Sequence, residues 1–193
     1  MFELLTGGAV GGLLSAAIAH VFTTLLDRAV GSQMWLKGPY GPPFFNIALF
    51  MGLLYGGIAL GLSRRRADVL IGALGPSLGI AVPMAVLTRL SLALPWMQIV
   101  IAVFVAAVWG TIFALGRQLT NRWAGGIAAC AGAFAGYLAL QSLTMLAPGL
   151  SGWRLHGYLP SPVVLLDGTL TATGMGLAVF LIRRRYGETA AGR

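Results

Sequence analysis

The chain has 193 residues, of which 58% are hydrophobic and 9% are charged, with a formal net charge of +8. A typical soluble domain carries about 25% charged residues, so this composition excludes an ordinary soluble globule. A mean hydropathy of +0.84 instead favours one membrane domain that spans residues 1–193. The basic excess does not indicate nucleic-acid binding, because arginines beside apolar runs are explained by membrane orientation and by contact with anionic lipid headgroups.

Six apolar segments follow one another along the chain, each close to the roughly 20 residues that a helix needs to cross about 30 Å of hydrocarbon. They are Leu4–Leu26, Phe44–Leu62, Val69–Thr88, Leu94–Leu115, Ala124–Ala147 and Val163–Ile182. None of them alternates at period two as a barrel strand does, so they predict helices. The sequence therefore predicts an all-α, polytopic membrane protein with six transmembrane helices arranged as three glycine-rich hairpins.

Arginine clusters follow every second segment. The connections Ser63–Asp68 and Gly116–Arg122, together with the chain from Arg183 onward, hold nine of the 13 basic residues. Short basic loops stay on the cytoplasmic side of a membrane, so both termini are predicted to be cytoplasmic. The opposite connections are rich in tryptophan, tyrosine and proline, which favour the headgroup level and the first turn of a helix.

Glycines recur at positions that indicate close helix packing and a threefold internal repeat. Aligning the arginine clusters at Arg64, Arg117 and Arg183 brings Gly57, Gly110 and Gly176 into register without a gap. The odd-numbered segments carry small-xxx-small pairs: Gly8 and Gly12, Gly75 and Gly79, Gly132 and Gly136. Because lipid supplies no hydrophobic force between helices, backbone contact through glycine holds spans together, and all nine glycines are predicted to be packing positions. Chance coincidence in glycine-rich segments remains the alternative to a true repeat.

Five polar residues fall in the outer half of the predicted spans, whereas the inner half is almost wholly apolar. They are His20, Asn46, Gln98, Gln141 and Asp167. An ionisable residue within a membrane span is costly and is a functional hypothesis by default. One interpretation is an outward-facing substrate pocket, with Asp167 as acceptor or counter-ion, His20 as its partner or a proton-linked switch, and the amides as donors. In the other, Asp167 reaches the interface or caps its helix, with Thr169 and Thr171 bonding locally, and His20 only satisfies a neighbouring helix.

Catalytic and metal motifs are missing from the sequence. There is no H-E-x-x-H, no G-x-S-x-G and no phosphate-binding loop, so no enzyme activity and no catalytic residue is predicted. One cysteine, Cys130, and two histidines leave no recognisable zinc or haem ligand set. We therefore expect no metal and no cofactor.

The second half of the chain carries several features in a fixed order. Trp123-Ala124-Gly125-Gly126 opens the fifth segment, a proline-rich connection precedes the sixth, and Asp167-Gly168 and Arg183-Arg184-Arg185 follow. In these features it resembles the YagU-like inner-membrane proteins of bacteria. The resemblance implies a bacterial inner (plasma) membrane location and an acidic residue in the last span, here Asp167. Thr169 stands where the family pattern would place a histidine, so no histidine-dependent role is carried over.

Two functions of different classes follow from these features. The first is binding or translocation of a small polar solute or ion by the outer-half pocket, as the polar residues cluster on one side. The second is a non-catalytic accessory subunit whose glycine-faced helices dock in a larger membrane complex. Besides the lipid bilayer, the expected partners are thus a small solute or ion, or further copies and other membrane subunits.

Overall fold

The computed structural model describes residues 2–30, 44–90, 96–152 and 159–191, and every regular element in these ranges is helical. The helices are α1 (Phe2–Val30), α2 (Phe44–Ser63), α3 (Arg66–Leu90), α4 (Trp96–Thr120), α5 (Trp123–Leu146), α6 (Gly149–Gly152) and α7 (Pro162–Ala191). The predicted all-α class is therefore confirmed for these residues. Each of the six predicted segments corresponds to one long helix, and the short α6 is an addition.

The turns at the arginine end are shorter than the sequence analysis predicted. Only Arg64–Arg65 separates α2 from α3, and only Asn121–Arg122 separates α4 from α5. Arg64 and Asn121 have φ angles of 58° and 55°, and this left-handed conformation reverses the chain within two residues. The last helix also continues beyond the predicted end at Ile182, so its three arginines are helical. The basic residues extend these helices because arginine is a good helix former.

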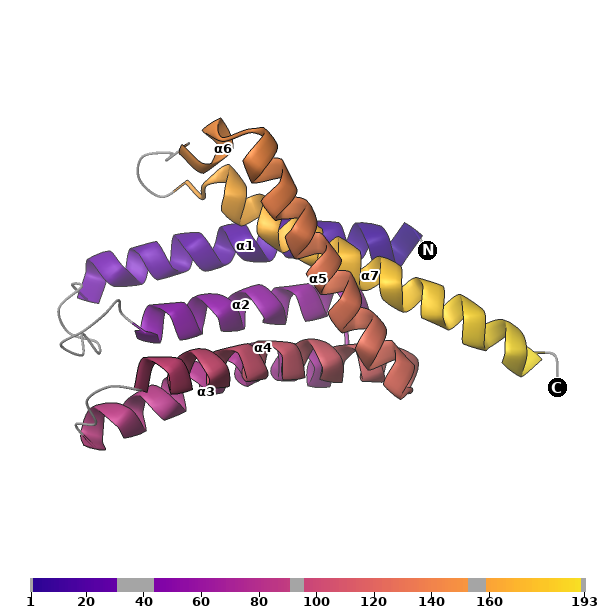
Figure 1. Cartoon of the computed structure of the whole chain (residues 1–193), viewed down its shortest axis with the longest axis horizontal. Helices are drawn as coiled ribbons and strands as arrows, with labels where there is room; N and C mark the ends of the chain where they lie inside the picture. The colour runs from indigo at the N-terminus through magenta and orange to yellow at the C-terminus, as the bar shows by residue number, and fades with distance from the viewer. Residues whose placement is uncertain (1, 31–43, 91–95, 153–158, 192–193) are drawn as a thin grey trace.

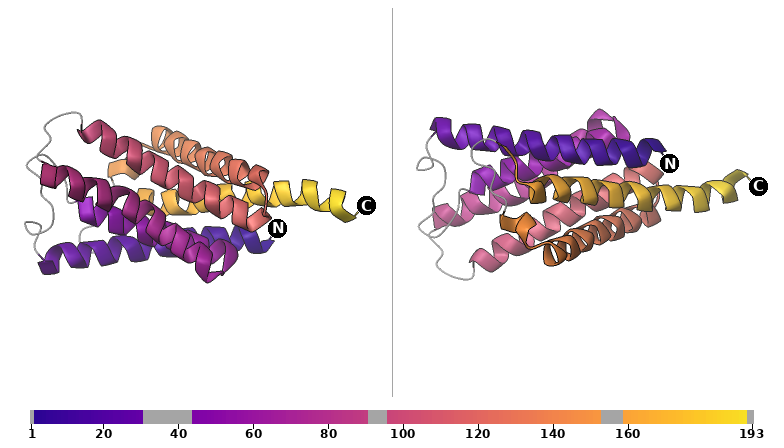
Figure 2. Two further views of the ribbon diagram at one scale, coloured as in Figure 1. Left: turned by 90° about the horizontal axis from the view of Figure 1, so that it is seen from below. Right: turned by 90° about the horizontal axis from the view of Figure 1, so that it is seen from above.

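The six long helices close into a ring. Going round it, α1 packs against α2, α2 against α3, α3 against α4, α4 against α5, α5 against α7, and α7 against α1. Across the ring, α7 also touches α2 and α4. In Figure 1, α1 to α4 run side by side while α5 crosses obliquely. The start of α1 and the end of α7 lie at the same end of the molecule, where the last turns of α7 extend past the other helices (Figure 2).

Helices α2, α4 and α7 supply the large side chains of the core. Ile58, Ile112, Leu115, Met175 and Val179 are each at most 1% exposed. Helices α1 and α5 add small residues to the same core, namely Ala16, Ala129 and Ala133. Small residues allow α1 and α5 to approach the backbones of their neighbours closely, and large residues fill the space between the others.

Glycine contacts within the three hairpins follow one pattern. In the first hairpin a Cβ on Gly7 of α1 would lie 2.5 Å from the carbonyl oxygen of Gly61 of α2, and one on Gly11 would lie 3.1 Å from that of Gly57. The other two hairpins repeat it: Gly75 and Gly79 face Thr111 and Ala107, and Gly132 and Gly136 face Gly174 and Leu170. Two small residues one turn apart thus hold each helical pair together.

This pattern changes the alignment that the arginine clusters indicated. Gly8 and Gly12 face Ala172 and Gly168 of α7, so the glycines of α1 that match the other hairpins are Gly7 and Gly11. Gly57 and Gly176 both pack against α1, beside Ser15 and Leu4 respectively. A Cβ on Gly110 would meet nothing within 4 Å, because this glycine lies on the exposed face of α4. Gly110 therefore takes no part in the packing of the described helices.

The outward faces of the helices are apolar. On α3, one face carries Leu70, Leu74, Leu78 and Val82, each more than half exposed, and the opposite face carries the buried residues Gly72, Pro76, Ile80 and Met84. A soluble monomer rarely exposes apolar surface on this scale. Five helices of the described chain are long and apolar enough to cross a membrane, and the apolar part of α2, Ile47–Ser63, is shorter. The structure is compatible with a multi-pass helical membrane protein.

Candidate functional site

Three polar side chains from two helices lie at similar heights inside the apolar ring. Asp167 of α7 is half-buried, and the hydroxyl of Thr171, one turn further on, donates to its Oδ1 at 3.5 Å, the long limit of a hydrogen bond. Tyr55 of α2 is 7% exposed and, from the registers of Ser15 with Gly57 and of Gly12 with Gly168, lies within about one helical turn of the height of Asp167. We call Asp167, Thr171 and Tyr55 the central polar cluster.

The packing of α7 explains how this cluster forms. Gly168 is in backbone contact with Gly12 of α1, which fixes the height and rotation of the neighbouring Asp167. Because α7 touches α2 across the ring, Asp167 and Tyr55 lie on helices in contact, although no hydrogen bond joins the two side chains in the described part of the chain. The Thr171 hydroxyl reaches Asp167 because residues four apart lie on one face of a helix.

Large apolar side chains separate the central polar cluster from the arginine end. They are Ile58 and Leu62 of α2, Ile112 and Leu115 of α4, and Met175 and Val179 of α7, all buried in one core. Asp167 itself is the sixth residue of α7, about 8 Å along the helix from its start. The cluster is therefore closer to the end where α2, α4 and α7 begin than to the arginine end.

His20 lies away from Asp167. Gly12 faces Gly168 and Gly8 faces Ala172 in antiparallel register, so Asp167 is level with Leu13 of α1. His20 is seven residues further along α1, roughly 10 Å by helical rise. Within the described chain no hydrogen bond or ion pair joins the two side chains. The partnership of His20 with Asp167 that the sequence suggested is not formed in this structure.

The predicted amide residues differ in position. Gln141 of α5 is half-buried and, from the register of Gly136 with Leu170, lies within about one helical turn of the height of Asp167. Gln98 is exposed in the first turn of α4. Asn46 belongs to the first turn of α2, but its side chain lies outside the described residues. Among the described amide side chains of the predicted pocket, only that of Gln141 lies at the height of the central polar cluster.

Sequence analysis assigned no role to Tyr55 and treated Thr171 only as a local partner. The spacing of four residues between Asp167 and Thr171 already indicated their bond. A hydroxyl-bearing aromatic in the middle of an apolar segment was the available signal for Tyr55. Thr169, the other threonine considered, donates to the carbonyl oxygen of Leu165 at 2.7 Å instead.

A second acidic side chain, Asp68, is buried near the arginine end. It is the third residue of α3, where the sequence analysis had placed a loop, and it is 0% exposed. Neither carboxylate oxygen has a hydrogen-bond partner in the described part of the chain. Asp68 begins the same buried face of α3 as Gly72 and Pro76, so the helix directs it inward. No group of three or more potential metal ligands occurs in the described residues.

Comparison with protein-family models, with curated proteins and with solved structures found no match. These comparisons therefore neither support nor oppose the resemblance of the second half to YagU-like proteins. The functional argument rests on the geometry of the chain itself.

Proposed function

We propose that this chain is a six-span membrane protein whose arginine clusters and both termini lie on the cytoplasmic side of a bacterial inner membrane. The support is the ring of six long helices, their apolar outward faces, and the gathering of Arg64–Arg66, Arg117, Arg122 and Arg183–Arg185 at the end that holds both termini. Basic residues beside apolar helices stay on the cytoplasmic side. The opposite end of the bundle, to which the central polar cluster is closer, then faces outward.

Within that frame, the chain binds or translocates a small cation or cationic solute, and Asp167 is its counter-ion. The observation that carries this proposal is the half-buried Asp167 carboxylate, with the hydroxyl of Thr171 at 3.5 Å from its Oδ1, in a largely apolar interior. Tyr55 of α2 supplies a further buried hydroxyl within about one helical turn of the same height. Carboxylate and hydroxyl oxygens are ligands for hard cations, and acidic residues within membrane spans mark ion and solute pathways. His20 lies between this cluster and the outer end, and Gln141 lies at about the height of the cluster. Both provide polar groups along the route by which the solute reaches Asp167.

The buried apolar side chains below the cluster close the path toward the cytoplasm. A solute bound at Asp167 crosses only if Ile58, Ile112 and Met175 separate, so transport requires a second arrangement of α2, α4 and α7. Binding alone requires no such change. Binding and transport are therefore separable by experiment.

Thermal unfolding of the detergent-purified protein tests the binding step. We would measure the unfolding temperature in sodium, potassium, magnesium and methylammonium chloride at matched ionic strength, since a ligand of the native state raises it. At least one cation is expected to stabilise the wild type and the Gln98→Ala control, and to have no effect on Asp167→Asn. No stabilising cation, or an equal response of Asp167→Asn, would contradict the proposal.

A second candidate function is that of an accessory subunit, and one observation favours it. Ala102, Ala106 and Gly110 form an exposed small-residue stripe on α4, with open space around Gly110. Such a face packs closely against another helix in lipid. Mild detergent extraction would then recover a stoichiometric partner that Gly110→Leu releases. Recovery of a monomer, or of a symmetric oligomer that Gly110→Leu leaves intact, would contradict this function.

A further inference from the structure

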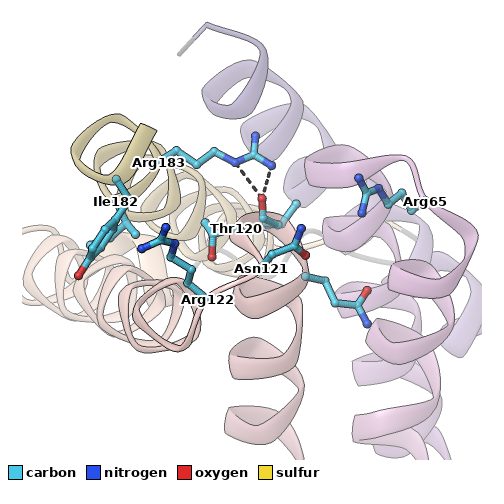
Figure 3. Close-up of a pocket in the computed structure, with 9 residues that line it drawn as sticks. Arg65, Thr120, Asn121, Arg122, Ile182 and Arg183 are labelled. Atoms are coloured by element: carbon cyan, nitrogen blue, oxygen red, sulfur yellow. Dashed lines mark hydrogen bonds between the residues drawn. The ribbon is translucent and has the colours of Figure 1, made fainter. Parts of the chain in front are cut away.

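Arginines from all three hairpins converge on one cavity of about 310 Å³ at the arginine end (Figure 3). Arg65 comes from the turn between α2 and α3, Arg122 from the turn between α4 and α5, and Arg183 from α7. No carboxylate belongs to the lining among the residues that the structure describes. Three like charges around one cavity repel one another, and a bound anion relieves that repulsion.

Two of these guanidinium groups are held in place by the protein. Arg183 donates from Nε to the carbonyl oxygen of Leu119 at 2.8 Å, and its Nη2 donates to the same oxygen. That carbonyl belongs to the last turn of α4, where carbonyls have no partner within the helix. The Arg122 guanidinium lies 4.8 Å from the ring centroid of Tyr186. Both arginines are therefore anchored without an acidic group from the side chains that the structure describes.

Arg65 supplies the third positive charge of the cavity. Its side chain is exposed and makes no hydrogen bond or ion pair with any described residue. Figure 3 shows it on the side of the cavity opposite Arg122, with Asn121 between them. The structure thus supplies two fixed guanidinium groups and one that can close on a ligand.

Neutral donors line the same cavity. The amides of Gln118 and Asn121 belong to the lining. Helix α5 begins directly after Arg122 and has no side-chain cap, although the N–H group of Gly125 donates to the carbonyl oxygen of Arg122 at 3.1 Å. Because Arg122 lines the cavity and precedes this helix, the positive end of the helix dipole lies next to one wall of the cavity.

We propose that Arg65, Arg122 and Arg183 form a binding site for the phosphate group of an anionic ligand. The planar guanidinium group donates two parallel hydrogen bonds to phosphate oxygens, which distinguishes phosphate from a spherical anion such as chloride. A volume of about 310 Å³ exceeds that of phosphate alone, so a group attached to the phosphate also fits. The phosphate comes from an anionic lipid headgroup or from a soluble phosphate compound, and the site does not depend on the role of Asp167.

Thermal unfolding in maltoside micelles, which contain no phosphate, tests the site directly. Inorganic phosphate is titrated against chloride at matched pH and ionic strength. The wild type is expected to gain stability with phosphate and not with chloride. Arg65→Gln should weaken the apparent phosphate affinity on the order of tenfold, because a hydrogen bond to a charged group is lost. Its stability without phosphate should stay near that of the wild type, because the Arg65 side chain makes no hydrogen bond or ion pair with a described residue.

Two further variants separate a specific site from general positive charge. Arg185→Gln removes an exposed arginine outside the cavity and should bind phosphate as the wild type does. Arg122→Lys keeps the charge but loses the planar fork, so its phosphate affinity should fall. If phosphate stabilises no more than chloride, or if Arg65→Gln and Arg185→Gln respond alike, the site does not exist.

Adding phosphatidylglycerol to the micelles distinguishes the two sources of phosphate. If a lipid headgroup occupies the cavity, phosphatidylglycerol stabilises the wild type and inorganic phosphate then adds nothing further. If the ligand is soluble, inorganic phosphate titrates equally with and without the lipid. In either case the stabilisation by the ligand should be smaller in Arg65→Gln and unchanged in Arg185→Gln. Equal stabilisation of these two variants would overturn the proposal.

Discussion

Gly12 of α1 and Gly168 of α7 touch backbone to backbone. A Cβ on Gly12 would lie 2.6 Å from the carbonyl carbon of Gly168, and one on Gly168 would lie 3.1 Å from the carbonyl carbon of Gly12. Real Cβ atoms essentially never come within 3.0 Å of another atom, and a Cβ on Gly168 would also lie 2.9 Å from the Cβ of Ala16, so neither position admits a side chain without moving a helix. Because Asp167 precedes Gly168, this contact joins the packing of the ring to the position of the central polar cluster.

Replacing glycine by alanine should have opposite effects at a glycine in this contact and at a glycine surrounded by open space. Gly12→Ala should destabilise the protein by about 1–3 kcal/mol, because the added methyl group forces α1 and α7 apart. Gly110→Ala should stabilise it by roughly 0.5–1 kcal/mol, because alanine favours the helix and open space surrounds this position. Unfolding of both variants in detergent would measure the difference. Equal effects would show that the approach of α1 to α7 is looser than described.

Tyr55 predicts how the central polar cluster works. Tyr55→Phe removes the hydroxyl and keeps the ring that packs in the core, so stability should remain within about 1 kcal/mol. If the hydroxyl helps to bind a cation, this variant weakens the cation-dependent rise in unfolding temperature. A cation-dependent rise equal to that of the wild type in Tyr55→Phe would mean that Tyr55 acts only in packing.

The buried carboxylate of Asp68 predicts a stabilising substitution. It is 0% exposed, and both of its oxygens lack hydrogen-bond partners among the described residues. Burial of a charged group without hydrogen bonds costs more than burial of a neutral amide, so Asp68→Asn should raise stability by about 1–3 kcal/mol. Glu3→Gln, at an exposed acidic residue in the first turn of α1, is the control and should change little. Destabilisation by Asp68→Asn would contradict this expectation and show that the folded protein stabilises the buried carboxylate.

The proposed topology predicts which side of the membrane each end of the bundle occupies. Single cysteines at Gly149 in α6 and at Arg185 in α7 would be introduced after replacement of Cys130 by alanine. Both positions are exposed, and a side chain at Gly149 meets nothing within 4 Å. The reagent is a maleimide that cannot cross the inner membrane, added to cells whose outer membrane has been made permeable. It should label Gly149→Cys and leave Arg185→Cys unlabelled. The reverse pattern would invert the orientation, and labelling of both would rule out the six-span arrangement.

The local features of the chain already indicated where the long helices lie, although the turns at the arginine end are shorter than predicted. Runs such as Ala124–Ala147 are apolar and long enough that only a helix satisfies their backbone in lipid, so their position follows from composition and length. The acidic residue in the last segment, Asp167, and its neighbour Thr171 four residues away were also visible from spacing alone. What these features share is that they depend on contacts within one helix.

Relations between helices required the tertiary structure. Small-xxx-small pairs indicate that a helix packs closely but not against which neighbour. Gly8 and Gly12 face α7, and Gly110 faces none of the described helices. Likewise, His20 and Asp167 are expected at similar depths from the outer end, yet the register of α1 against α7 separates them by roughly 10 Å along the helices. The rotation and height of each helix are decided by packing against its neighbours, because the bilayer constrains the length of a helix and not its partner.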